Sequence, residues 1–240
     1  MSSGKTAWEL VWGRYKEAPD TYPGVKEVLE TLTPKGLFEE PSEYRPICNK
    51  KEEERLEKAI IALSSASSKD ALAIVKTMAA EHAHRSIWVW ATLGDSPLAL
   101  AIGHLRDLAE VIESTGNPST RETLAEYYTT QGWKADNSVL RALGAARSVS
   151  STKAVTAAIR VVYLPWLEKV ATLTQALAST FPVTGPQTCR TLSSAEGTVY
   201  LFADGLRMDL AKSLERKLDL LGNCIFGNPF WPGGSASGNG

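Results

Sequence analysis

The chain has 240 residues, of which 43% are hydrophobic and 22% charged, and its formal net charge at pH 7 is −1. This length holds one large domain or two small ones, and the composition is typical of a folded protein rather than a disordered one. The balanced charge gives no electrostatic footprint for nucleic acid or for an anionic membrane.

The cysteines and the N-terminal residues indicate a compartment. Cys48, Cys189 and Cys224 lie far apart with no C-x-x-C spacing, so they predict neither a disulfide framework nor a zinc ribbon. Free structural thiols in a reducing compartment are favoured. The first ten residues include Lys5 and Glu9 and lack the apolar run of a secretory signal. No apolar stretch reaches the length of a membrane span, and the predicted location is the cytoplasm.

Helical periodicity dominates residues 1–190. Residues 33–49 are rich in proline and predict an irregular segment, and the other gaps are short. Short gaps predict antiparallel neighbours in a bundle or a solenoid-like stack. The expected helices cover residues 7–15, 24–32, 50–64, 70–93, 97–116, 119–132, 137–146 and 151–179.

Capping signals set several of these boundaries. Asp70 is the predicted cap of the helix over 70–93, which ends where Gly94 serves as the stop. Ser96 followed by Pro97 predicts the start of the next helix. Ser119 and Glu122 have the spacing of a capping box.

Three further features concern helix interiors and ends. Gly132 predicts the end of the helix that begins after residue 119, and Pro165 predicts a kink or a break in the helix over 151–179. In the charged helix over 50–64, an apolar side is expected from Leu56, Ile60 and Leu63.

The period changes after a linker at residues 181–197. Val199–Ala203 is a continuous apolar run that suits a strand buried on both faces, followed by a turn at Asp204-Gly205 and an amphipathic helix. The predicted fold is therefore mostly α: a helical domain over residues 1–190, then the first βα unit of an incomplete α/β domain over 191–240 with a flexible tail. One such unit does not make a stable sheet.

Asp204 is the strongest candidate site residue. A carboxylate at the C-terminal end of a buried parallel strand lies where α/β folds place their chemistry, and its hard oxygens suit Zn²⁺, Mg²⁺ or Mn²⁺. The alternative is that Asp204 only forms the turn and caps the helix. Asp209 is expected to complement the dipole of that helix. Arg207 is expected to be solvated, with contact to a phosphate as the alternative.

Other patterns carry no comparable signal. Gly4-Lys5-Thr6 lacks the first glycine of a phosphate-binding loop. His82 and His84 are two residues apart on a helix, so they point in different directions and cannot clasp one metal ion. His104 has no ligand partner at helical spacing. The tryptophans are expected to anchor the core: Trp88, Trp90, Trp133 and Trp166.

Three segments together resemble one protein family. The run Val199–Asp209, which reads VYLFADGLRMD, resembles the opening of the PglZ domain, a member of the alkaline phosphatase superfamily found in BREX phage-defence systems. His82–Ala99 (HAHRSIWVWATLGDSPLA) and Ala157–Leu167 (AAIRVVYLPWL) are similar to the helical region that precedes this domain. The resemblance spans roughly residues 7–222.

The resemblance implies a metal-dependent phosphatase or phosphodiesterase-like domain behind a helical region. By position, Asp204 corresponds to the aspartate that binds catalytic metal at the end of the first strand. The family's threonine-rich nucleophile segment does not align with the residues after Gly222, although Ser235 and Ser237 supply hydroxyls nearby. We therefore expect an N-terminal piece of a longer protein, without turnover of its own.

Two alternatives remain open from the sequence. One is a helical scaffold that binds other BREX proteins, supported by the long helical region. The other is a self-sufficient domain in which the lone strand pairs across a homodimer, so that a homo-oligomer is expected.

Overall fold

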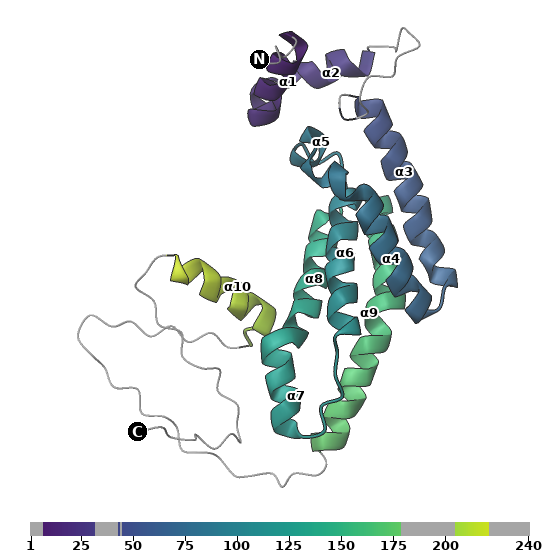
Figure 1. Ribbon diagram of the computed structural model, residues 1–240, viewed down its shortest axis with the longest axis vertical. Helices are drawn as coiled ribbons and strands as arrows, with labels where there is room; N and C mark the ends of the chain where they lie inside the picture. The colour runs from purple at the N-terminus through teal and green to yellow at the C-terminus, as the bar shows by residue number, and fades with distance from the viewer. Residues whose placement is uncertain (1–6, 32–42, 44, 179–204, 221–240) are drawn as a thin grey trace, which may run out of the picture. The chain divides into compact units, whose positions relative to one another are not determined.

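The structure is a computed structural model of the chain, and it describes residues 7–31, 43, 45–178 and 205–220 (Figure 1). Within these ranges every regular element is a helix, so the prediction of a mostly α fold is confirmed. The predicted strand at Val199–Ala203 and the predicted domain boundary near residue 190 lie outside the described residues.

The chain divides into two compact units. The first comprises Met1–Ser114 and Ser138–Leu167, and the second comprises Thr115–Asn137 and Glu168–Gly240. The α-helices are α1 (Ala7–Glu17), α2 (Gly24–Thr31), α3 (Pro46–Ala62), α4 (Ser68–His82), α5 (Val89–Thr92), α6 (Pro97–Glu113), α7 (Arg121–Tyr127), α8 (Trp133–Ala145), α9 (Val149–Ala178) and α10 (Met208–Asp219). Shorter turns of 3₁₀- or π-helix lie between them: η1 (Pro19–Thr21), η3 (Leu63–Ser65), η4 (Ala83–Ile87) and η5 (Tyr128–Gly132).

The core of the first unit forms where α4 and α3 pack on α6. The apolar side expected from Leu56, Ile60 and Leu63 is confirmed, because all three side chains are buried. Helix α6 repeats apolar residues at helical spacing, and each buried leucine contributes about 1.5–3 kcal/mol of transfer free energy. The fully buried residues of α6 and α9 in this unit include Leu98, Ala101, Ile102, Leu105, Leu108, Ala109, Ala154, Val155, Ala158 and Val162.

An aromatic cluster joins α1 and α2 to the segment around α5. Trp12 packs against Tyr15 and Trp90, with ring centroids 5.4 and 6.1 Å apart. Trp88 and Leu29 are buried in the same cluster. The predicted role of the tryptophans as core anchors is confirmed at all four positions, since Trp88, Trp90, Trp133 and Trp166 are buried.

The prediction of a single helix over residues 70–93 is wrong, because this range is divided among α4, η4 and α5. The cap is Ser67 rather than Asp70: the Ser67 hydroxyl accepts a hydrogen bond from the Asp70 backbone N–H at 3.1 Å. The break at η4 coincides with Arg85, a buried charged side chain that an uninterrupted amphipathic pattern would not place in the core. Gly94, with φ of 82°, ends α5 as predicted.

The second unit departs from the prediction at its capping box and at Gly132. The box is made by Thr120 and Thr123, one residue beyond Ser119 and Glu122, because two threonine hydroxyls satisfy each other's backbone N–H groups. Gly132 does not end a helix. It closes the π-turn η5, and α8 follows directly.

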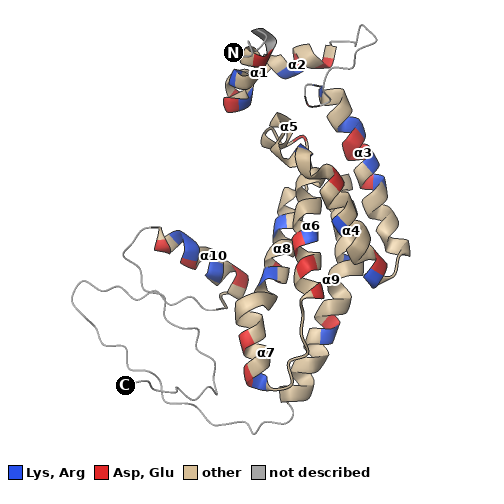
Figure 2. Cartoon of the chain, viewed as in Figure 1, with Lys and Arg blue, Asp and Glu red and all other residues tan. Residues whose placement is uncertain are grey.

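Pro46 differs from the expectation, and at Pro165 the helix does not break. Pro46 is the first residue of α3, where its missing N–H costs nothing, so the helix begins four residues before Lys50. Pro165 lies inside α9, which continues to Ala178. Figure 2 shows acidic and basic residues interspersed along α3 and α10, as a net charge near zero would suggest.

Candidate functional site

The family-like motif is described from Gly205 onward, and Asp204 lies outside the described residues. Gly205 has a φ of 65°, in the left-handed region that favours glycine. Arg207 is the N-cap of α10, so the predicted turn and amphipathic helix are present after the aspartate.

Among the described residues of this motif, Asp209 is the most deeply buried charged one. It lies in the first turn of α10, where a carboxylate complements the helix dipole as predicted, but it is only 1% exposed. Its Oδ1 accepts a hydrogen bond from Nε of Arg207 at 3.0 Å. Arg207 is half-exposed, as expected of a solvated arginine, and it is also ion-paired with Asp209.

The π-turn η5 supplies a second polar pair in the same unit. Tyr128 donates its hydroxyl hydrogen to Oδ2 of Asp136 at 2.5 Å. Burial raises the pKa of Tyr128, and the hydrogen bond to Asp136 and the charge of Asp209 raise it further, so the phenol stays a donor at neutral pH. The charges of Arg207 and Asp209 therefore act on the same site as this pair.

Gly132 explains why the π-turn can form. A Cβ at this position would lie 3.0 Å from Cδ2 of Tyr128 and 3.1 Å from Cε1 of Tyr127, which is tighter than most side-chain contacts, so one of the rings would have to shift. The absence of a side chain lets both rings pack over the turn. Single π-turns inside helices are frequent at functional sites, and this one positions Tyr128 against Asp136.

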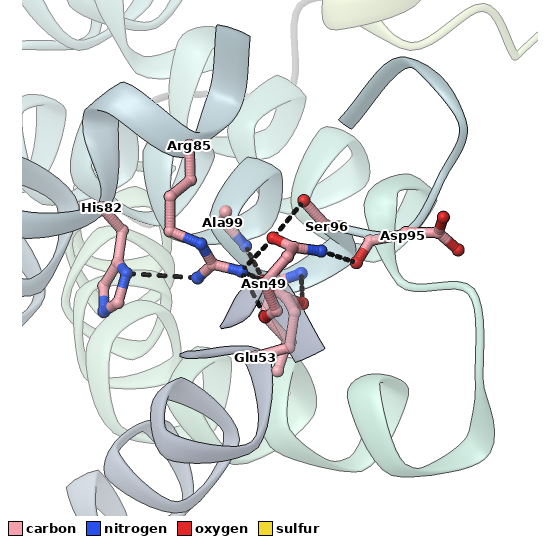
Figure 3. Close-up of polar contacts among 8 residues, drawn as sticks. Asn49, Glu53, His82, Arg85, Asp95, Ser96 and Ala99 are labelled. Atoms are coloured by element: carbon pink, nitrogen blue, oxygen red, sulfur yellow. Dashed lines mark hydrogen bonds and ion pairs between the residues drawn. The ribbon is translucent and has the colours of Figure 1, made fainter. Parts of the chain in front are cut away.

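A buried polar network occupies the first unit, and we call it the Arg85 hub: Asn49, Glu53, Arg85 and Ser96 (Figure 3). Arg85 is 1% exposed. Its Nη2 donates to the Asn49 side-chain oxygen at 2.8 Å and to Glu53 Oε1 at 2.7 Å. Buried charges persist in proteins when they are paired and hydrogen-bonded in this way.

Glu53 also caps the N-terminus of α6. Its carboxylate accepts hydrogen bonds from the backbone N–H groups of Leu98 at 2.8 Å and Ala99 at 3.1 Å. Ser96, predicted to cap this helix, instead donates to the Asn49 side-chain oxygen at 2.9 Å. The start at Pro97 is confirmed, but the capping oxygen comes from another helix.

The hub was missed from the sequence, although α3 carries a signal for it. Asn49 and Glu53 continue the stripe of Leu56, Ile60 and Leu63 at intervals of four, three, four and three residues. Polar residues that extend an apolar helical stripe are expected to be buried with it. The partner Arg85 had no comparable signal, because its burial depends on the break in the helix.

The histidines have individual surroundings. Nδ1 of His82 lies 3.2 Å from Nη1 of Arg85, and the ring of His84 packs edge-on against Trp88 at 5.1 Å. His104 lies 3.9 Å from a carboxylate oxygen of Asp107.

Among the residues that the structure describes, no three His, Cys, Asp or Glu side chains gather as a metal-binding group. Cys48 is a free, partly buried thiol.

An apolar groove of about 580 Å³ lies along α1 and α2, and we call it the α1–α2 groove. It is lined by Val11, Trp12, Arg14, Tyr15, Tyr22, Gly24, Val25, Val28 and Leu29. Val11, Tyr22 and Val28 are each more than half exposed. A contiguous exposed apolar surface of this kind is typical of an interaction site.

Comparison with known families, with curated proteins and with solved structures gave no match to this chain. None of the helices within the described ranges combines the length and the apolar character that crossing a bilayer requires.

Proposed function

We propose that this chain is the helical N-terminal part of a PglZ-like protein of a BREX phage-defence system. It acts in the cytoplasm as a scaffold for a metal-dependent phosphatase or phosphodiesterase-like domain that begins near residue 191. In that domain Asp204 binds a catalytic divalent ion, Zn²⁺, Mn²⁺ or Mg²⁺, as the resemblance implies.

One observation carries the proposal more than any other. Two residues of the family-like motif, Arg207 and Asp209, pair with each other at 3.0 Å, and their charges act on Tyr128 of the π-turn. The start of α10 therefore lies close enough to the π-turn of its own unit for these charges to act on Tyr128. A helical region that holds the first element of a catalytic domain is what the scaffold role requires.

The α1–α2 groove supports a binding role toward other proteins of the same defence system. Its floor is fixed by the packing of Trp12 and Tyr15 against the aromatic cluster, while Val11 and Val28 remain exposed. A preformed apolar surface binds a complementary helix or loop without first reorganising. This is the second role that we assign to the chain, and it is compatible with the first.

Co-purification tests the binding role. The tagged chain is co-expressed with the other BREX proteins, and a Val11→Glu, Val28→Glu double variant is compared with Val149→Glu, which places one glutamate on an exposed valine outside the groove. We expect the double variant to lose at least about tenfold of the recovered partner, because a buried unpaired charge costs more than 1.4 kcal/mol.

The Val149→Glu control should recover the partner at the wild-type level. Equal recovery with all three chains contradicts binding through the groove. Light scattering of the isolated chain then shows whether the groove instead joins two copies.

A further inference from the structure

A cavity of about 520 Å³ lies in the first unit between α3, α4 and η4, and we call it the α3–η4 cavity. One wall includes Cys48, Lys51, Arg55 and Ala59 of α3. These residues follow one another at intervals of three, four and four, so they share one face of the helix. Cavities of a few hundred Å³ are the size that holds a small molecule.

The floor of the α3–η4 cavity is apolar. Leu56 of α3, Met78 of α4 and Trp88 after η4 line it, and all three side chains are buried. The ring of His84 packs edge-on against Trp88 at 5.1 Å. An aromatic ring beside an adaptable methionine suits an apolar body, either aromatic or aliphatic.

The rim of the cavity carries an excess of positive charge. Three of the lining side chains are cations, Lys51, Arg55 and Arg85, and two are carboxylates, Glu52 and Glu81. Arg55 pairs with Glu52 at 3.1 Å, and Arg85 pairs at 2.7 Å with a glutamate of the Arg85 hub. Lys51 is exposed and makes no hydrogen bond or ion pair with any residue that the structure describes. It is therefore the cation that a bound anion would meet.

His82 adds a hydrogen-bond donor to the same cavity. Nη1 of Arg85 lies 3.2 Å from Nδ1 of His82, within hydrogen-bonding geometry (Figure 3). A guanidinium group carries only donors, so Nδ1 is the acceptor and the imidazole proton is on Nε2. Arg85 is itself fixed by the Asn49 side chain at 2.8 Å. The Arg85 hub thus presets which ring nitrogen of His82 donates.

We propose that the α3–η4 cavity binds a small amphiphilic anion. An apolar body lies against Leu56, Met78 and Trp88, and a carboxylate, sulfonate or phosphate group lies at Lys51. The Nε2–H group of His82 is the second polar contact. Glu81, an exposed carboxylate on the α4 side, disfavours a second negative charge, so a monoanion is expected. This site is independent of the function proposed above.

A pair of fluorescent probes tests the site on the full chain. Anilinonaphthalene sulfonate has an apolar aryl body and one negative charge, and phenylnaphthylamine has the same body without the charge. We expect Lys51→Glu to weaken binding of the sulfonate about tenfold, because an attraction becomes a repulsion, and to leave the neutral probe unchanged. The matched control is Lys58→Glu, which makes the same change at an exposed lysine of α3 outside the cavity and should keep wild-type affinity for both probes.

The thiol of Cys48 reports where the probe binds, since Cys48 lines the cavity and is free. Saturating sulfonate probe should slow alkylation of Cys48 by iodoacetamide, followed by peptide mass spectrometry. The Val11→Glu, Val28→Glu variant should bind the sulfonate like wild type.

Three results would overturn the proposal. The first is equal affinity of wild type and Lys51→Glu for the sulfonate, and the second is an equal loss of both probes in Lys51→Glu. The third is loss of the sulfonate in the double variant with Cys48 unprotected in wild type, which assigns the probe to the α1–α2 groove.

Discussion

At the scale of single residues, the structure depends on buried charges whose partners come from distant parts of the chain. Glu53 serves two needs at once, since its carboxylate pairs with Arg85 and accepts the first N–H groups of α6. A buried pair of this kind adds little net stability over an apolar pair of the same shape. Losing one partner is far more costly, because the other charge stays buried.

Glu53→Gln tests this dependence. It leaves the charge of Arg85 uncompensated in the core, and we expect the free energy of unfolding to fall by about 3–5 kcal/mol. Glu52→Gln is the matched control, since the neighbouring Glu52 makes an exposed pair with Arg55 that contributes about 0–1 kcal/mol. Urea unfolding measures both, and equal losses would show that the Arg85 hub does not stabilise the fold.

At the scale of elements, the boundaries show what a sequence can and cannot predict. Helix starts with local signals, such as Pro97, were predicted because the chemistry lies within a few residues. The break at η4 and the π-turn at Gly132 were missed, because both depend on packing between residues far apart or on crowded rings. Asp209 was placed correctly in its helix, but its burial was not predicted.

Gly132→Ala tests the packing at η5. Alanine would normally stabilise a helical position by about 1 kcal/mol over glycine, but here its Cβ meets the rings of Tyr127 and Tyr128. We expect a net destabilisation of about 1–3 kcal/mol from the crowding. In Gly103→Ala, on α6, no described atom beyond the adjoining residues and backbone of its own helix lies within 4 Å of the new Cβ, and we expect a gain of about 0.4–1 kcal/mol. Thermal melts of both variants measure these changes in stability. A Gly132→Ala variant that is more stable than wild type would contradict the close contact.

At the scale of the whole chain, the mostly α fold and its buried tryptophans followed from periodicity and composition. The candidate site was predicted less well from the sequence than the fold was. The sequence pointed to Asp204, whereas the described polar clusters centre on Arg85 and on Tyr128 with Asp136. Neither cluster has a short motif, because each joins side chains from several helices. The scaffold role rests on these clusters and on the resemblance of three segments to one family.

The expectation that this chain has no turnover of its own is tested most directly by hydrolysis of a chromogenic phosphodiester by the purified chain with added Zn²⁺ or Mn²⁺. The resemblance carries over one metal-binding aspartate and no nucleophile, and each missing catalytic group costs roughly 10²- to 10⁴-fold in rate. We therefore predict the same background rate for wild type and for Asp204→Ala. Turnover above background that disappears in Asp204→Ala would contradict the account, because the chain would then be an enzyme in its own right.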